Sequence, residues 1–387
     1  MYPDLSYILH GIFGIEPDNW ASVIKTFGLM LAFAFLASAW ILSLEMKRLT
    51  VAGILKPVQV KVIEGEAPTV QFVLIQALIG FIIGFKGVYI VQNSEAFLAD
   101  AAAVLLSTTG STIGGILGAI IFGGLQYYLK NKKALPKPKE SLQTVQPYQM
   151  VGDITVMAAI SGLIGAKVFA IFESADTISA FVKDPLGQLF SGTGLAIYGG
   201  LIVAFFVVLR FVRKQGFPGL NMMDAAAPGM ITGYAVGRIG CQLSGDGDWG
   251  IASGIKPGWL QWLPDNLWAQ TYPHNVLKEG VPIEDCVWDY CTQLPVAVYP
   301  TPVYETIMGF IILGILWALR KRITAPGFIF FLYAFLAGIE RLFIEKIRVN
   351  DTFPFLGMEV TQAEIISVVF MLLGIGGMIW TKRRVSK

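Results

Sequence analysis

Long apolar runs dominate the hydrophobic pattern of this chain. A run of about 18 apolar residues is the length that a helix needs to cross a bilayer. Some runs fall slightly short and must extend into flanking interfacial residues or tilt little. We therefore predict an all-α polytopic membrane protein with about nine transmembrane helices, at Phe27–Leu44, Thr69–Val91, Thr112–Leu129, Ile154–Phe172, Gly194–Leu209, Met222–Leu243, Tyr304–Leu319, Gly327–Phe343 and Ala363–Trp380.

Composition supports this class. Of the 387 residues, 55% are hydrophobic and 14% are charged, whereas soluble domains carry roughly 25% charged residues. The mean hydropathy is +0.62, and the net charge of +2 gives no indication of a nucleic-acid partner. The composition excludes an ordinary soluble enzyme or a nucleic-acid-binding module.

The basic residues predict the orientation, because short cytoplasmic loops collect Lys and Arg. With nine spans, their distribution places the N-terminus outside and the C-terminus inside the cell. The cations that fall on alternate loops and on the C-terminal tail are Lys47, Arg48, Lys56, Lys61, Lys130, Lys132, Lys133, Lys137, Lys139, Arg210, Arg213, Lys214, Arg320, Lys321, Arg322, Lys382, Arg383, Arg384 and Lys387.

Two polar segments interrupt the apolar runs. The longer one, Ser244–Val298, is predicted to be an extracytoplasmic cap (residues 244–298), whose tryptophans suit either the membrane interface or a small aromatic core. Its two cysteines, Cys286 and Cys291, are left open as a disulfide or as free thiols. The Lys-Pro-rich segment Lys130–Pro147 is predicted to be an exposed linker. His10 and His274 lie far apart without further ligands nearby, so no metal site is expected.

Charged residues within apolar helices point to the candidate site, because each costs about 2.5–3.5 kcal/mol at the centre of a lone span. Such residues need a partner, a route to the interface or a function. They are Lys167 in the fourth span, Arg238 in the sixth, Glu305 beside Tyr304 at the start of the seventh, and Arg341, Glu345 and Arg348 at the end of the eighth.

The last three residues are spaced i, i+4 and i+7, which places them on one face of a helix. Arg341 and Glu345 can therefore pair, and a structural ion pair at a helix end is one interpretation. The predicted topology also brings Lys167 and Arg238 to the outer side, with Asp246 and Asp248. Such convergence favours an anionic ligand, since guanidinium groups donate to phosphate in pairs.

Glycines flank these residues. Gly237 and Gly240 bracket Arg238, and Gly199 and Gly200 follow Tyr198. One interpretation is close helix packing. The other is that a missing side chain lets a lipid headgroup approach the backbone.

Six segments, in the same order, resemble motifs of the prolipoprotein diacylglyceryl transferase family. The segment Gly165–Lys167 is similar to the family's Gly-Ala-Arg motif, Gly194–Ile202 to Gly-x-x-x-His-Gly-Gly-Leu-Ile, and Asp224–Pro228, followed by Gly237 and Arg238, to Asp-x-x-Ala-Pro. The segment Tyr299–Glu305 is similar to His-Pro-Ser-Gln-Leu-Tyr-Glu. Ala337–Arg348 is similar to Tyr-Gly-x-x-Arg-Phe-x-x-Glu-x-x-Arg, and Thr361–Ser367 to Thr-x-x-Gln-x-x-Ser.

The resemblance covers roughly residues 27–48 and 153–387 of one transmembrane domain (residues 1–387). The family has seven spans, so residues 51–150 read as an insertion with two extra spans, which keeps the later helices in orientation. Three departures occur. Tyr198 replaces a histidine, Cys241 and Ser244 replace two asparagines, and Asp246 or Asp248 replaces a glutamate.

The resemblance implies a transferase that moves the diacylglyceryl group of phosphatidylglycerol to the lipobox cysteine of a prolipoprotein signal peptide, without a cofactor. It implies the bacterial inner membrane, with the active site toward the outer leaflet. Arg238 and Arg341 would hold the phosphate and Glu345 would orient Arg341. The proton acceptor is left open among Tyr198, Lys167, Asp246 and Asp248. The substrate-binding set would add Gly199, Gly200, Gly237, Gly240, Ser244, Tyr304, Glu305 and Arg348.

Two other functions are consistent with the sequence. An inactive lipid-binding relative would explain the departures at Tyr198, Cys241 and Ser244. A transporter for an anionic solute would also place cations within spans, but its inverted repeats are not evident.

Overall fold

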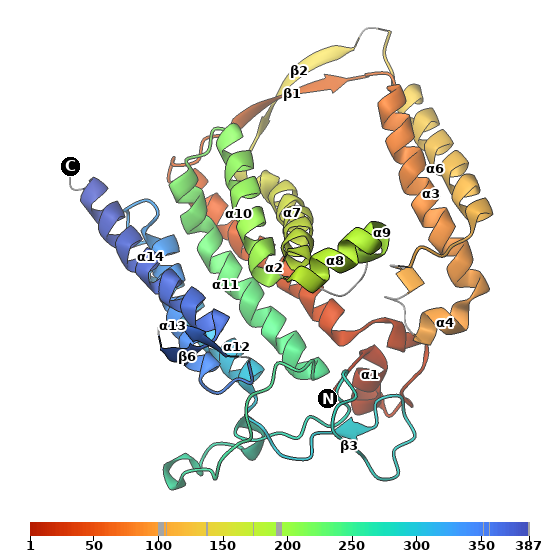
Figure 1. Cartoon of the computed structure of the whole chain (residues 1–387). Helices are drawn as coiled ribbons and strands as arrows, with labels where there is room; N and C mark the ends of the chain where they lie inside the picture. The colour runs from red at the N-terminus through yellow and green to blue at the C-terminus, as the bar shows by residue number, and fades with distance from the viewer. Residues whose placement is uncertain are drawn as a thin grey trace. The chain divides into compact units, whose positions relative to one another are not determined.

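The structure is a computed structural model that describes residues 1–99, 104–105, 107–136, 138–172, 174–190, 196–350, 352–355 and 357–385 (Figure 1). Gly194, with which the fifth predicted span begins, and the cations Lys137 and Lys387 lie outside these residues. The chain divides into two compact units. The first contains Met1–Lys56 and Val212–Lys387, and the second contains Pro57–Phe211.

Each apolar run coincides with a helix, because in lipid only internal hydrogen bonds satisfy the backbone. Six helices of the described residues are long and apolar enough to cross a membrane: α2, α3, α6, α7, α12 and α14. The all-α polytopic class is confirmed, and nine spans stay a prediction. The helices that coincide with the nine predicted runs are α2 (Thr26–Val51), α3 (Val70–Gln92), α6 (Thr112–Lys132), α7 (Val151–Ile171), α10 (Ile197–Lys214), α11 (Gly219–Ser244), α12 (Thr301–Leu319), α13 (Phe328–Glu345) and α14 (Gln362–Val385).

The first unit is a bundle in which α11 is central. Helix α11 packs against α2, α12 and α13, and α14 packs against α13 (Figure 1). Its buried core comprises Ala227, Ile231, Ile312, Leu316 and Ile329. Before α2 the chain forms α1 (Leu5–Phe13) and the short helix η1 (Trp20–Val23), and between α13 and α14 it forms the hairpin of β5 (Phe353–Phe355) and β6 (Met358–Val360).

Two carboxylates, the half-buried Asp224 and the buried Glu45, fix the helices of this unit relative to each other. Asp224 of α11 accepts hydrogen bonds from the backbone N–H groups of Gly327 (2.6 Å) and Phe330 (2.9 Å), and so caps α13 from a neighbouring helix. Glu45 of α2 pairs with Arg48 (2.8 Å) and with Arg320 after α12 (2.6 Å). Both contacts lie at the ends of α11 and α12 far from the cap, so they hold the helices that carry the site.

The cap, Gly245–Pro300, joins α11 to α12 with little regular structure. It contains η3 (Gly258–Leu260), η4 (Asp265–Leu267) and the paired strands β3 (Val281–Pro282) and β4 (Thr292–Gln293). Cys286 and Cys291 form a disulfide.

The cap tryptophans fall into two groups, and the first forms the predicted small aromatic core. Trp249 packs on the buried Tyr272 with 5.1 Å between ring centroids, and Trp288 packs edge-on against Tyr7 of α1 at 5.7 Å. Trp259 and Trp262, by contrast, are each 76% exposed. The cap therefore has a small aromatic core, and it presents two indole rings to its surroundings.

The second unit contains a helical hairpin of α3 and α6. It also contains a ladder of two β-strands, which the sequence analysis does not predict. Strand β1 (Val58–Glu64) pairs antiparallel with β2 (Lys139–Val145), with Val58 opposite Val145 and Glu64 opposite Lys139 (Figure 1). The segment Lys130–Pro147, which was predicted to be an exposed linker, contains strand β2, and most residues of this strand are exposed. Between these strands run α3, α4 (Ser94–Ala99) and α6; after them come η2 (Pro147–Met150), α7, α8 (Ala175–Lys183), α9 (Pro185–Phe190) and most of α10.

Glycines let α3 and α6 approach backbone to backbone. A Cβ atom at Gly118 would lie 2.2 Å from the carbonyl oxygen of Gly80, and one at Gly84 would lie 2.1 Å from that of Gly114. Since real Cβ atoms essentially never come so close, we expect Gly118→Leu to destabilise the hairpin by about 1–3 kcal/mol. Thermal unfolding in detergent would measure the change.

Gly124→Leu is the matched control, because it makes the same exchange in the same helix where nothing lies within 4 Å of a new Cβ atom. Equal melting temperatures for the two variants would contradict the packing role of Gly118.

Candidate functional site

The charged residues singled out in the first unit gather at the cap end of three helices. Arg238 lies in the last two turns of α11, Glu305 in the first turns of α12, and Arg341 with Glu345 in the last turns of α13. The turn after α11 adds Asp246 and Asp248, and the turn after α13 adds Arg348. Residues far apart in sequence are therefore brought together by helix packing and by two short turns.

Glu305 is the centre of this cluster and is fully buried. Its carboxylate oxygens lie 3.3 Å from Arg238 Nε, 3.5 Å from Arg341 Nη1 and 3.7 Å from Arg348 Nη1. Three guanidinium groups thus surround one carboxylate. The predicted meeting of Arg238 and Arg341 at one end of the bundle is confirmed, with Glu305 between them.

The Arg341–Glu345 pair forms as predicted, with 3.0 Å between Nη2 and Oε2. Asn350 Nδ2 also donates to the Glu345 carboxylate, at 2.7 Å. The prediction that Arg348 continues the same helical face was wrong, because α13 ends at Glu345. Arg348 reaches the cluster from the following turn, where it forms a β-bridge with Gly250 of the cap.

Gly250 is required at that bridge by close approach. The backbone N–H of Ile251 donates to the carbonyl of Ile347 (2.8 Å), and a Cβ atom at Gly250 would lie 2.5 Å from the same oxygen. The cap is thereby attached to the end of α13.

Asp248 joins Arg238 to Arg348, with one carboxylate oxygen on each guanidinium. Burial by itself raises the pKa of Asp248, but Arg238 and Arg348 more than offset this and hold the pKa below its usual value. Asp246 differs, since burial and the charge of Asp248 raise the pKa of its carboxyl group. The pKa values of these two carboxyl groups, which are only two residues apart, are therefore shifted in opposite directions.

The lowered pKa of Asp248 predicts that the free energy of unfolding decreases in acid. A carboxyl group whose folded-state pKa is lowered contributes stability above its unfolded pKa of about 3.9, and that contribution is lost as the pH falls through the folded value. We expect Asp248→Asn to be less stable than the parent protein at neutral pH, with the difference shrinking in acid. Denaturation followed as a function of pH would measure it.

Asp265→Asn is the control for that experiment, because Asp265 also pairs with a cation, Lys256, but is 97% exposed. A constant difference between the Asp248 variant and the parent protein at every pH would contradict the ion-pair assignment.

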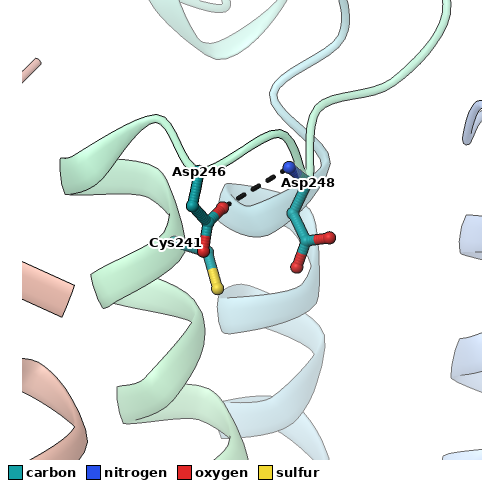
Figure 2. A group of neighbouring side chains, drawn as sticks. All are labelled: Cys241, Asp246 and Asp248. Atoms are coloured by element: carbon teal, nitrogen blue, oxygen red, sulfur yellow. Dashed lines mark hydrogen bonds between the residues drawn. The ribbon is translucent and has the colours of Figure 1, made fainter. Parts of the chain in front are cut away.

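Cys241, Asp246 and Asp248 form a compact group, with one potential ligand atom of each within 4.8 Å of the others (Figure 2). Asp246 Oδ1 accepts from the backbone N–H of Asp248 at 3.4 Å, and its carboxylate faces the Cys241 thiol (Figure 2). Both oxygens of Asp248 are held by guanidinium groups. Asp248 would have to leave these guanidinium groups before it could bind a cation.

Most of the other predicted site residues of the first unit make contacts that hold its helices and the cap together. Ser244 is buried and its hydroxyl donates to the carbonyl of Gly240 (2.8 Å). Tyr304 donates to the cap carbonyl of Leu267 (2.8 Å). Gly240 packs on Met30 of α2, where a Cβ atom would lie 2.9 Å from the methionine Cβ, whereas Gly237 has open space around it.

Four predicted residues lie in the second unit. Lys167 of α7 is buried, and Tyr198 of α10 is half-buried. Gly199 and Gly200 are close-packing positions between these helices, because their Cβ atoms would lie 2.2 Å from Phe169 Cβ and 2.8 Å from the carbonyl of Gly162.

Two residues of the cluster were not predicted. Tyr234 lies one turn before Arg238 on α11, and the Arg238 guanidinium sits over its ring, 5.3 Å from the centroid. The Tyr234 hydroxyl lies 3.1 Å from Glu305 Oε1 and 2.9 Å from Glu340 Oε1. Glu340 is the second residue that was not predicted. Two features of the sequence could have indicated the pair: Tyr234 lies four residues before Arg238, and Glu340 directly precedes Arg341.

A cavity of about 770 Å³ lies between the cap and the N-terminal segment, beside Gln242 of α11. Gln242 donates to Gln270 (2.7 Å) and accepts from Tyr272 (2.9 Å). Aromatic rings of Tyr7 and Trp288 form part of its wall.

The comparisons point to one family. The sequence profile of the prolipoprotein diacylglyceryl transferases matches residues 124–380. Similar proteins, each described as a phosphatidylglycerol–prolipoprotein diacylglyceryl transferase, come from Leptospira interrogans (30% identity over 226 residues, 52% of this chain and 63% of the relative), Dehalococcoides mccartyi (28% over 239 residues, 61% and 79%) and Lysinibacillus sphaericus (27% over 250 residues, 64% and 82%). The match thus covers less than two thirds of the Leptospira protein.

Proposed function

The chain belongs to the prolipoprotein diacylglyceryl transferase family, and from this premise we propose that it transfers the diacylglyceryl group of phosphatidylglycerol to the lipobox cysteine thiol of a prolipoprotein. The products are a thioether and glycerol phosphate. The observation that carries the proposal is the convergence of Arg238, Arg341 and Arg348 on one buried carboxylate at the cap end of the bundle.

The phosphate of the lipid binds where Asp248 now joins two arginines. A carboxylate bridging two guanidinium groups has the charge and spacing of two oxygens of a phosphodiester. Arg238 and Arg348 would exchange Asp248 for the phosphate, and Arg341, oriented by Glu345, would face it across Glu305. Developing charge on the departing phosphate is then met by donors already in place.

Attack by the substrate requires a base, because a free thiol with a pKa of about 8.5 is only a few per cent ionised at neutral pH. Asp246 suits this role better than Asp248. Burial raises the pKa of Asp246, whereas the oxygens of Asp248 are engaged by arginines. Tyr198 and Lys167 of the second unit are the alternative bases.

We place the protein in the bacterial inner membrane with its site toward the outer leaflet. The disulfide of the cap supports this orientation, since disulfides persist outside the cytoplasm. The N-terminal segment supports it too, because Tyr2 N donates to the carbonyl of Leu243 (2.6 Å) and Tyr7 packs on the cap. The disulfide and the N-terminal segment lie at the end of the bundle opposite Arg320, one of the basic residues that the predicted orientation places in the cytoplasm.

The direct test is to incubate the purified full chain, in phosphatidylglycerol vesicles, with a synthetic lipobox peptide. We expect the peptide to gain a diacylglyceryl group on its cysteine, detected by mass spectrometry, and no product in vesicles of phosphatidylethanolamine alone.

The alternatives give other outcomes. Phosphatidylglycerol binding without product would indicate an inactive lipid-binding relative, which the departures at Tyr198, Cys241 and Ser244 favour over a transporter. Flux of an anionic solute across the vesicle wall would indicate a transporter. Either result would contradict the proposed reaction.

A further inference from the structure

The Tyr234 hydroxyl lies between two buried carboxyl groups, 3.1 Å from Glu305 Oε1 and 2.9 Å from Glu340 Oε1. A hydroxyl has one proton, so it can donate to only one of these oxygens. The second contact is a hydrogen bond only if that carboxyl group is itself protonated and donates to the tyrosine oxygen. A proton on Glu305 or on Glu340 makes both contacts full hydrogen bonds.

Charge balance places this proton on Glu340. Glu305 has three guanidinium groups around it, whereas Glu340 is buried and has no cation within ion-pair distance in the described part of the chain. Four carboxyl groups, those of Asp248, Glu305, Glu340 and Glu345, share three arginines. An isolated buried carboxylate is costly, so the one without a partner is the one that stays neutral.

The other elements around Glu340 bring no further cation. Helix α11 contributes Tyr234 and Arg238, whose guanidinium is engaged by Asp248 and Glu305. Helix α13 itself contributes Tyr333 and Arg341, and Arg341 pairs with Glu345. Helix α14 packs on α13, and its nearest ionisable group, Glu364, pairs with Lys346.

We propose that Glu340 stores the proton that the departing phosphate takes up, and that Tyr234 and Glu305 relay it. This inference rests on the proposed transferase reaction. Tyr234 gives its proton to Glu305 and takes the proton of Glu340. Glu305 lies among the guanidinium groups that hold the phosphate, and there it protonates the phosphate oxygen.

The reaction balances with this relay. The thiol sulfur forms a bond to the glycerol carbon while that carbon's bond to the phosphate oxygen breaks, and the electron pair leaves with the phosphate. The phosphate monoester receives the proton from Glu340. The thiol proton passes to the base, which then releases it to the medium, and Glu340 takes up a proton from the medium before the next turnover.

Glu340→Gln tests the proton store, because the amide still hydrogen-bonds to Tyr234 but cannot supply a proton. In phosphatidylglycerol vesicles we expect kcat to fall about 100-fold with KM for the lipid nearly unchanged. Tyr234→Phe should lose a similar factor, and the double variant should lose no more than either single variant, since the residues act as one unit. The parent enzyme should also lose activity at alkaline pH, as Glu340 deprotonates, and the Gln variant should not.

Glu284→Gln, a change at an exposed residue of the cap, is the control and should act like the parent enzyme. Activity of Glu340→Gln within about twofold of the parent enzyme, or losses that multiply in the double variant, would overturn the relay.

Infrared spectroscopy tests the stored proton without relying on turnover. The parent protein at about pH 7 should show the C=O band of a protonated carboxyl group, which Glu340→Gln should lack and Glu284→Gln should retain. A parent protein that shows this band but forms no thioether would refute the proposed function and not the proton store. Absence of the band would refute the store even in an active enzyme.

Discussion

Replacing Arg238 with alanine is expected to lower kcat/KM for phosphatidylglycerol about 1000-fold. Arg238 contacts both Asp248 and Glu305, so its loss removes a donor to the lipid phosphate in the ground state and in the transition state. Rates of thioether formation at several lipid densities would separate the effect on kcat from that on KM.

Two variants sharpen this experiment. Arg238→Lys keeps the charge but not the paired donors, so it should regain only part of the lost activity. Arg322→Ala changes an exposed arginine beyond α12 and should leave the rate unchanged. A folded Arg238→Ala protein that keeps more than about a tenth of the parent activity, a loss of under 1.4 kcal/mol, would contradict the phosphate assignment.

Stability must be followed in parallel, because Arg238 is also structural. In its absence Glu305 keeps Arg341 and Arg348, and Asp248 keeps Arg348. We therefore expect a lowered melting temperature but a folded protein, since each carboxylate retains a partner.

Replacing Glu305 with leucine is expected to destabilise the protein by about 3–5 kcal/mol, because it removes the shared partner of buried guanidinium groups. Of all the residues in the cluster, Glu305 alone contacts Arg238, Arg341 and Arg348. Reversible denaturation in mixed micelles would measure the change in the free energy of unfolding.

Charge compensation distinguishes lost pairing from lost packing. The double variant Glu305→Gln with Arg348→Gln should be more stable than the sum of the two single changes predicts, because either single change already removes the contact between these two residues. Glu284→Leu, at an exposed position of the cap, should be nearly neutral. A Glu305→Leu protein as stable as the parent would show that the carboxylate does not hold the cluster together.

The helices were predictable because they are a local property of the sequence. Backbone groups in an apolar solvent must bond within their own segment, so an apolar run of sufficient length specifies a helix whatever surrounds it. Every predicted run coincides with a helix. The three helices outside the six apolar candidates, α10, α11 and α13, are ones that carry several charged or polar residues.

The site was predictable only in part. Charged residues inside apolar runs indicated Arg238, Arg341 and Glu305, since each needs a partner in that environment. Glu340 was overlooked although it directly precedes Arg341, because one charge in a run does not reveal which helix it faces. Arg348 was assigned to the wrong element, because the end of α13 is set by the β-bridge between Arg348 and Gly250 of the cap.

Sequence alone thus determined the class of protein, the positions of its helices and which charged side chains require partners, because these follow from the length and polarity of each segment. Only the tertiary structure decided the pairing of those charges. The contacts of Glu305 with Arg238 and Arg341, and of Tyr234 with Glu340, join helices α11, α12 and α13 across long stretches of chain. Their physical basis is helix packing and the capping of α13 by Asp224, which no local pattern encodes.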